Sequence, residues 1–220
     1  MNDEIKMFCE RIFAAGLSDS HGANVSQKSG EKMLITRRDA MLSDIGDNDV
    51  LELSLSSGAD PSEAPKETVM HRAIYKSTNA LAVIYTISPY AVAISISDSK
   101  VVPQDLRGTS ILRSVPVTRV SDQITEDEAN KIAQGLLSKD SGVVVVKGRG
   151  AFAYAKSLSE ALKLATVLEN SCKILIALRS TSQARPQPSP AQHRERPGEA
   201  RRAIPPGIGV MDRSRYRRKF

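Results

Sequence analysis

The sequence predicts an α/β fold with a central, mainly antiparallel sheet, helices on both faces and a basic C-terminal tail. Apolar runs typical of strands alternate with segments of helical periodicity along the first 180 residues. Some neighbouring strands are joined by short turns, as in antiparallel hairpins, whereas others are separated by helices. The composition then changes, because 6 of the 11 prolines lie within residues 181–220.

The charge distribution separates the tail from the body. Residues 181–220 contain 10 Lys and Arg against 3 Asp and Glu, whereas residues 1–180 contain 21 and 22. The net charge of +6 therefore belongs to the tail, and the body is close to neutral. Since the tail has too few apolar residues to bury a core, we expect a folded domain over 1–180 and a disordered tail over 181–220.

The first half of the chain begins with a helix. Ile5, Phe8, Cys9, Ile12 and Phe13 recur at three- and four-residue spacing, and a glycine follows at a position where a helix would stop. A polar, glycine-bearing segment comes next, which predicts a loop or a short strand. Two strands, a proline-rich loop, a short helix and a buried strand are then expected at 33–36, 50–55, 59–65, 67–77 and 81–87.

Local capping signals organise the second half. Pro89 favours the first position of a helix. Thr125 and Glu128 form a capping-box pattern at the start of another. The longest helix, after Ser157, carries an apolar stripe that should cover one sheet face. The elements expected here are helix 89–97, strand 115–120, helix 125–138, strands 142–146 and 151–155, and helix 157–180.

Composition argues against several classes of protein. No run of about 18 apolar residues is present and the N-terminal segment is acidic, so we expect a cytoplasmic chain without a membrane partner. Cys9 and Cys172 lie on apolar helix faces without a CxxC pattern, which predicts reduced core residues. Only three histidines occur and no GxSxG motif is present, so a nucleophilic hydrolase is not predicted.

Two short segments are candidates for chemistry. The turn 147–150, Lys-Gly-Arg-Gly, combines flexible backbone with cations and suits an anion, although a tight glycine hairpin is the alternative. Glu67 and His71 are four residues apart and so share a helix face. Glu67 could serve as a general acid or base, and an ordinary exposed pair is the alternative.

Taken in order, these segments resemble the class II aldolase/adducin family, of the fuculose-phosphate aldolase type. The resemblance covers about residues 1–180 and implies a class II aldolase-like fold, with Glu67 at the position of the acid/base carboxylate. The matching segments are 22–26 for the GNxS loop, 34–36 for the strand before a Thr-Pro-Ser-Gly turn, 67–75 for the ExxxHxxIY helix, 82–91 for AVVHTHSPYA, and 146–151 for ANHGLL.

Compared with the family that it resembles, this sequence differs at the positions of the metal ligands. The family's lyases hold Zn²⁺ with three histidines, and the corresponding positions here are Tyr85, Ile87 and Arg149. Isoleucine has no lone pair, arginine repels a cation, and one tyrosine alone cannot retain zinc. We therefore expect no metal ligands and no cofactor.

The family's phosphate site is altered as well. Asn24 and Ser26 remain, but Arg38 and Lys66 stand where the family has hydroxyl donors. Together with Arg149 these cations could bind a small phosphorylated ligand. Solvated surface charge is the alternative.

These features favour a non-catalytic or repurposed domain, an adducin-like scaffold that binds a small anion. The resemblance implies a homo-oligomer, a cyclic tetramer. The alternative is an aldehyde-lyase acting on a fuculose-type sugar phosphate, metal-independent if active, with Glu67 as its catalytic residue.

The tail adds a possible binding function of its own. Cations and aromatic residues alternate near the end of the chain, a composition that suits single-stranded nucleic acid or an acidic protein partner. A tail that only solubilises the protein is the alternative. The residues expected to make such contacts are Arg213, Arg215, Tyr216, Arg217, Arg218 and Lys219.

Overall fold

The computed structural model describes residues 2–56 and 60–183. The predicted tail, 181–220, lies outside these residues apart from its first three, which belong to the last helix. The predictions for Arg213, Arg215 and the other cations of the tail therefore fall outside the described part of the chain.

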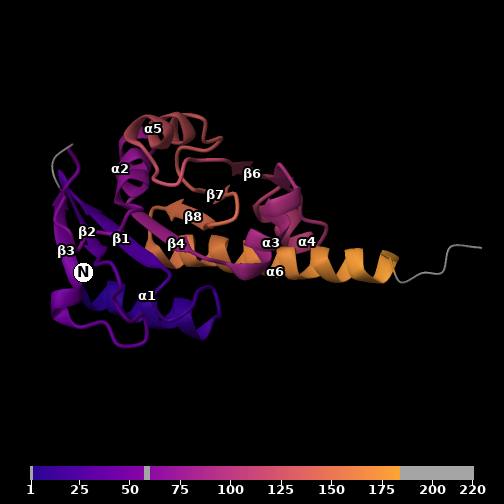
Figure 1. Ribbon diagram of the computed structural model, residues 1–220, viewed down its shortest axis with the longest axis horizontal. Helices are drawn as coiled ribbons and strands as arrows, with labels where there is room; N and C mark the ends of the chain where they lie inside the picture. Colours follow the sequence, from indigo (N-terminus) through magenta and orange to yellow (C-terminus); the bar gives the residue numbers. More distant parts are fainter. Residues whose placement is uncertain (1, 57–59, 184–220) are drawn as a thin grey trace, which may run out of the picture. The chain divides into compact units, whose positions relative to one another are not determined.

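An eight-stranded sheet forms the centre of the fold, with the strand order β3-β2-β1-β4-β8-β7-β6-β5 (Figure 1). All neighbouring pairs are antiparallel except β6 and β7, which run parallel. The predicted, mainly antiparallel sheet is therefore confirmed. The strands are β1 (Asn24–Ser29), β2 (Lys32–Thr36), β3 (Val50–Ser54), β4 (Ala82–Thr86), β5 (Lys100–Val101), β6 (Val115–Thr118), β7 (Gly142–Val146) and β8 (Gly150–Ala155).

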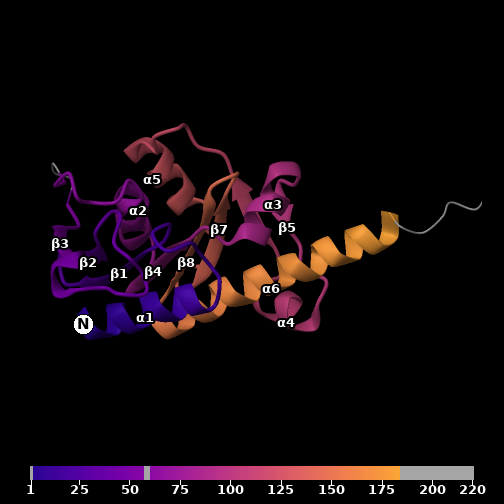
Figure 2. The same cartoon turned by 60° about the horizontal axis from the view of Figure 1, so that its bottom comes forward.

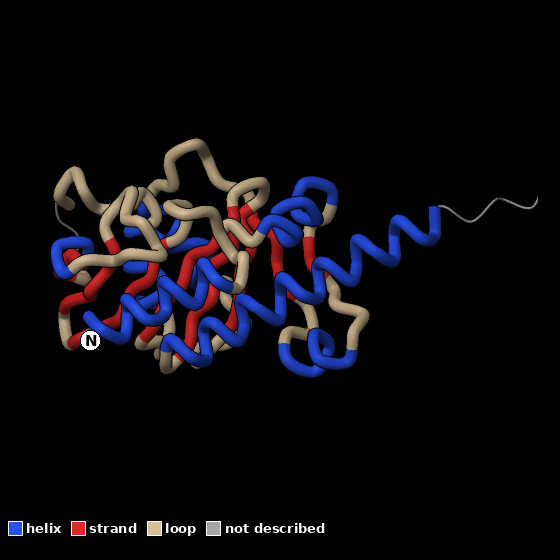
Figure 3. The backbone as a smooth tube through the Cα atoms, turned by 90° about the horizontal axis from the view of Figure 1, so that it is seen from below, coloured by secondary structure: helices blue, strands red, loops and turns tan. Residues whose placement is uncertain are grey.

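Helices cover both faces of this sheet, as predicted. On one face α1 (Asn2–Ala14) and α6 (Leu158–Gln183) lie along the strands, and α3 (Pro89–Ser97) packs with α6 (Figures 1 and 2). Seen from below, α1 and α6 pass in front of the strands (Figure 3). The opposite face carries α2 (Thr68–Ser77) and α5 (Glu126–Gln134).

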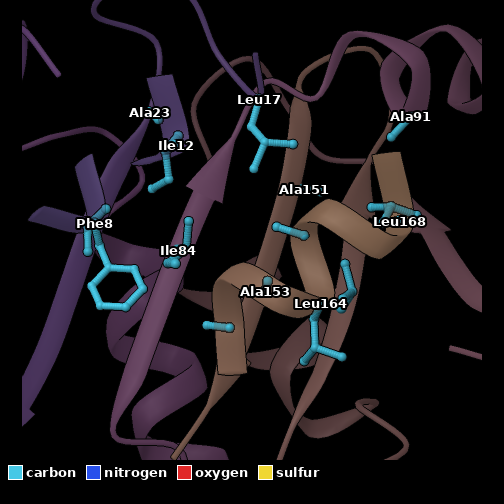
Figure 4. Packing of buried hydrophobic residues seen from close by; sticks show 14 of the residues in the cluster. Phe8, Ile12, Leu17, Ala23, Ile84, Ala91, Ala151, Ala153, Leu164 and Leu168 are labelled. Atoms are coloured by element: carbon cyan, nitrogen blue, oxygen red, sulfur yellow. The ribbon is translucent and has the colours of Figure 1, made fainter. Parts of the chain in front are cut away.

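Side-chain size differs between the two faces of β8. Ala151, Ala153 and Ala155 belong to the core beneath α6, whereas Phe152 and Tyr154 point into the core beneath α2 and α5. Figure 4 shows two of these alanines in the cluster that contains Leu164 of α6. Small side chains let the helix backbone approach the sheet closely, and the larger rings fill the wider space on the other face.

Local signals placed several element boundaries correctly. Pro89 is the first residue of α3, and Thr125 and Glu128 form the expected capping box at α5. Gly16 ends the first helical segment with a φ of 65°. Two details were wrong: Phe13 is 41% exposed, and α5 ends at Gln134 because the chain leaves the helix at Gly135.

Three short elements escaped the sequence reasoning: the 3-10 helix η1 (Asp47–Asp49), β5 and the helix α4 (Leu106–Ile111). Asp105 caps α4 by accepting a hydrogen bond from the Gly108 N–H at 2.7 Å. The same side chain accepts a 2.6 Å bond from the Ser171 hydroxyl of α6. A Cβ at Gly108 would lie 2.2 Å from Ser171 Oγ, so α4 rests directly on α6.

The long helix α6 also holds the start of α3. Glu169 is only 1% exposed, and its carboxylate accepts hydrogen bonds from the N–H groups of Tyr90 at 3.0 Å and Ala91 at 3.1 Å. Both groups belong to the first turn of α3, where backbone N–H groups have no acceptor within the helix. The turn between β4 and α3 is therefore anchored from beneath.

Neither cysteine is available for chemistry. Cys9 and Cys172 are free and buried, and burial raises the pKa of both thiols to about 12. No helix among the described residues is long and apolar enough to cross a membrane.

Candidate functional site

A cleft of about 390 Å³ opens where the ends of β1, β2 and β4 meet the turn between β7 and β8. It brings together five of the six predicted site residues, namely Asn24, Arg38, Lys66, Glu67 and Arg149. The complete lining is His21, Gly22, Ala23, Asn24, Arg37, Arg38, Asp39, Pro65, Lys66, Glu67, Tyr85, Ile87 and Arg149.

Glu67 is held in the cleft by a neighbour from the sheet. It immediately precedes α2, and Asn24 is the first residue of β1, where it lies opposite Tyr85 of β4. The Asn24 amide donates a hydrogen bond from Nδ2 to Glu67 Oε2 at 3.2 Å. The strand register therefore fixes the carboxylate at the ends of β1 and β4.

Ser26, the sixth predicted residue, does not line the cleft. Its hydroxyl is fully buried and lies 2.7 Å from both His71 Nδ1 and the Tyr75 hydroxyl. Burial lowers the pKa of His71 to about 3, so this imidazole is neutral in the fold. The alternative of an exposed Glu67–His71 pair is wrong, because His71 belongs to the core.

Cations outnumber carboxylates in the lining of the cleft. Arg37, Arg38, Lys66 and Arg149 share it with the carboxylates of Asp39 and Glu67. Two further carboxylates, Asp49 and Asp122, lie outside the lining at 3.9 Å from Arg37 and Arg149. The ammonium of Lys66 has no ion-pair or hydrogen-bond partner among the residues that the structure describes.

All three arginines are partly engaged, Arg37 through the carboxylate of Asp49. Arg38 Nε lies 3.6 Å from Asp39 Oδ2 at an exposed position. Arg149 donates from Nη2 to the carbonyls of Ser121 at 2.8 Å and Asp122 at 2.7 Å. Within the described chain this leaves its Nη1 and Nε donors without a hydrogen-bond acceptor, so the guanidinium keeps free donors for an anion.

The positions that the resemblance assigns to zinc ligands also meet here, and they do not fit zinc. Tyr85 donates its hydroxyl to the carbonyl of Arg149 at 3.2 Å, and burial raises the pKa of this phenol above its ordinary value. Ile87 has no donor atom, and the Arg149 side chain is a cation. Zinc needs about three protein ligands with N, S or O lone pairs. Over residues 2–56 and 60–183, no group of three or more His, Cys, Asp and Glu side chains could hold a metal ion.

Two glycines, Gly22 and Gly150, pack closely against the side chains of Ile87 and Tyr85. A Cβ at Gly150 would lie 2.3 Å from the Thr86 carbonyl oxygen and 2.9 Å from the Tyr85 ring. A Cβ at Gly22 would lie 2.2 Å from Cδ1 of Ile87. The ring and the isoleucine therefore pack directly on backbone, with no space between.

The turn 147–150 is the tight glycine hairpin between β7 and β8. Gly148 adopts a φ of 70°, and the Gly148 N–H donates to Ser95 Oγ at 3.0 Å. This turn is therefore a tight hairpin, and it also places Arg149 in the lining of the cleft.

Sequence reasoning missed three lining residues, His21, Arg37 and Asp39. Arg37 and Asp39 flank Arg38 in the turn after β2, and Asp39 has an unusual positive φ of 62°. The sequence signal that could have identified them is adjacency: Arg37 and Asp39 flank Arg38, and His21 precedes Gly22.

Comparisons with known proteins identify the family of this fold. Residues 3–176 match the family described as Class II Aldolase and Adducin N-terminal domain. An L-fuculose phosphate aldolase of Methanocaldococcus jannaschii is 23% identical over 169 residues, which covers 76% of this chain and 91% of the relative.

Solved structures show the same fold. The crystal structure of L-fuculose-1-phosphate aldolase from Thermus thermophilus matches with a TM-score of 0.77 and 32% identity, over 84% of this chain and 97% of that chain. YgbL from Escherichia coli, described as a putative aldolase/epimerase/decarboxylase, matches with a TM-score of 0.71 over 80% and 88% of the two chains. Its 18% identity supports the fold alone.

Proposed function

Since this chain belongs to the class II aldolase and adducin family, we propose that its cleft binds a small anion, such as a phosphate ester, without the zinc-dependent chemistry of a lyase. One observation carries the proposal: four cations and two carboxylates line a cleft in which the metal-ligand positions are a phenol, a hydrocarbon and a guanidinium.

Three of the cations would contact the anion. Lys66 supplies an ammonium without a competing partner in the described chain, and Arg149 supplies its free Nη1 and Nε donors. Arg38 is held only by an exposed ion pair, which contributes little to stability and is easily exchanged for a ligand. Hydrogen bonds from charged donors to phosphate oxygens are about twice as strong as neutral ones.

A lyase is the second candidate, and two observations favour it. The relatives are named L-fuculose phosphate aldolases, and Glu67 faces the cleft where a carboxylate could move a proton. Aldol cleavage also needs a positive group at the developing oxyanion. Arg149 would have to supply it, with a guanidinium already donating to two carbonyls, so we favour a binding function.

Binding of inorganic phosphate to the full chain tests the first candidate. We expect a rise in the melting temperature and measurable heat of binding, and about tenfold weaker binding in Lys66→Gln, since one charge-assisted bond is lost. Lys76→Gln is the matched control, because Lys76 is exposed at the far end of α2 and outside the cleft. Equal affinity of Lys66→Gln and the wild type would rule out this site.

Elemental analysis separates the two candidates. We expect substoichiometric zinc in the purified chain and no stabilisation by added Zn²⁺. One zinc per chain, together with cleavage of fuculose 1-phosphate that a chelator abolishes, would contradict the proposed binding function and support the lyase.

We also propose a homo-oligomeric scaffold. Large apolar side chains remain exposed on the α3, α4 and α6 side, with Ile96 at 62%, Leu106 at 87% and Ile174 at 40%. Sedimentation at several concentrations measures the assembly, and a tetramer is expected. A monomer at all concentrations would contradict it.

The tail remains a prediction from composition. We propose that its cations bind a polyanion, either single-stranded nucleic acid or an acidic protein. Anisotropy of a labelled oligouridine and of an acidic peptide, at low and high salt, should show weaker binding in a variant with Arg215, Arg217 and Arg218 changed to Ser. Unchanged affinity for both probes would leave the tail without this role.

A further inference from the structure

An apolar wall shares the cleft with its cations, and this feature limits the ligand more than charge alone does. Ala23, Pro65, Tyr85 and Ile87 form this wall. Arg38, Lys66 and Arg149 line the same space. The cleft therefore presents both positive charge and hydrocarbon to a ligand.

Two polar groups near this wall already donate hydrogen bonds within the protein. The Tyr85 hydroxyl donates to the Arg149 carbonyl, and only 7% of the Tyr85 residue is exposed. The Asn24 Nδ2 group donates to Glu67, and Asn24 Oδ1 is buried without a partner and out of reach of solvent. Ala23, Pro65 and Ile87 have no hydrogen-bonding side-chain atoms, so this wall offers a ligand few of them.

Ile87 is the most specific part of the wall. It is half-buried, and its Cδ1 rests on the backbone of Gly22. The turn that follows Ile87 is anchored through Glu169, so the side chain stays in place. A ligand hydroxyl placed against it would give up its water and gain no partner, which is unfavourable. An apolar group in the same place would instead be removed from water.

Building on the proposed anion-binding function, we infer that the ligand is an anion with an apolar body, an aryl or alkyl phosphate rather than a polyhydroxylated sugar phosphate. The anionic group lies against the cations, and the hydrocarbon covers Ile87 and the edge of Tyr85. The cleft volume of about 390 Å³ lies within the usual range for small-ligand sites.

Calorimetric titration of the full chain with three phosphates tests this inference. Inorganic phosphate, phenyl phosphate and glycerol 1-phosphate are compared at pH 8, where all three are mostly dianions. We expect phenyl phosphate to bind at least about tenfold more tightly than glycerol 1-phosphate, the gain for roughly two methylene groups removed from water. Glycerol 1-phosphate should bind no more tightly than inorganic phosphate.

Variants at Ile87 assign the preference to its side chain. Ile87→Thr should weaken the binding of phenyl phosphate much more than that of inorganic phosphate, and so remove most of the preference. Ile87→Val, which keeps the fold with the smallest change, should reduce the preference partly. Leu137→Thr is the matched control, because Leu137 is 89% exposed and lies outside the cleft.

The outcomes distinguish this inference from the proposed function. Tighter binding of phenyl phosphate that depends on Ile87 supports both. Binding of inorganic phosphate with equal or tighter binding of glycerol 1-phosphate overturns the apolar ligand and leaves the anion site standing. Absence of binding by all three phosphates overturns both.

Discussion

Replacing Glu169 by alanine should remove the anchor of α3. The carboxylate accepts from two backbone N–H groups, and the change leaves both without this acceptor. Ala91 is fully buried, so its N–H loses a partner that water cannot replace, at about 1–3 kcal/mol. Tyr90 is 41% exposed and its N–H can be rehydrated, which adds about 0.5–1 kcal/mol.

Part of this loss is offset within the native protein. Burial raises the pKa of Glu169, which means that desolvation of the carboxylate opposes its two hydrogen bonds. We therefore expect Glu169→Ala to lower the free energy of unfolding by about 2–3 kcal/mol. Glu169→Gln keeps the volume and one acceptor oxygen and should lose roughly half of that amount.

Urea denaturation of the full chain measures these changes as a shift in midpoint at constant slope. Asn170→Ala is the matched control, because Asn170 is the next residue of α6 and is exposed. Its effect should stay within about 0.5 kcal/mol. If Glu169→Ala proves no more destabilising than Asn170→Ala, the reasoning about the anchor is refuted.

Three further substitutions test other parts of the structure. Gly150→Ala places a Cβ 2.3 Å from a backbone carbonyl oxygen and should cost about 1–3 kcal/mol in thermal melts, whereas Gly135→Ala, with no atom nearer than 3.5 Å, should be close to neutral. Because burial lowers the pKa of His71 from 6.5 to about 3, the unfolded chain takes up this proton first, so stability is lost as the pH falls from about 6.5 towards 3. His71→Gln should flatten that part of the pH profile of unfolding, and an unchanged slope would contradict the assignment. Hydrogen bonds, with the Ser121 hydroxyl as the largest cause, lower the pKa of Glu128 to about 2, so its stabilising effect is present above pH 4.5 and lost on acidification towards 2. The difference in melting temperature between wild type and Glu128→Gln should shrink over that range, and a constant difference would argue against the cap.

The fold was predictable where short-range signals decide the structure. Pro89 begins a helix because its ring presets φ, and Thr125 begins another because its hydroxyl accepts an N–H three residues on. The helix α4 was missed although its cap is also local, because Asp105 accepts the Gly108 N–H three residues on. The helix is only six residues long with a glycine inside, and the Asp105 contact with Ser171 spans 66 positions of the chain.

The candidate site was predictable in outline from the order of its segments. Asn24 and Glu67 come from distant segments, and strand register brings them to a 3.2 Å contact. Ser26 was expected beside Asn24 from the resemblance to the family's GNxS loop, and alternate residues of a strand do share a face. Two residues along β1, however, that face is already covered by α2, and Ser26 bonds to His71 instead of facing the cleft.

The interior is divided into two hydrophobic cores, one on each face of the sheet, and this division determines which backbone amides are best protected from solvent. Strands β4, β7 and β8 carry apolar side chains into both cores, so their amides are shielded from above and below. Their amide hydrogens should be the slowest to exchange with deuterium, since only global unfolding exposes them. Tyr85 belongs to β4 and Arg149 directly precedes β8, so both residues lie on a rigid part of the sheet. This part of the cleft is therefore preorganised, and the proposed ligand would lose little affinity to rearrangement of the protein.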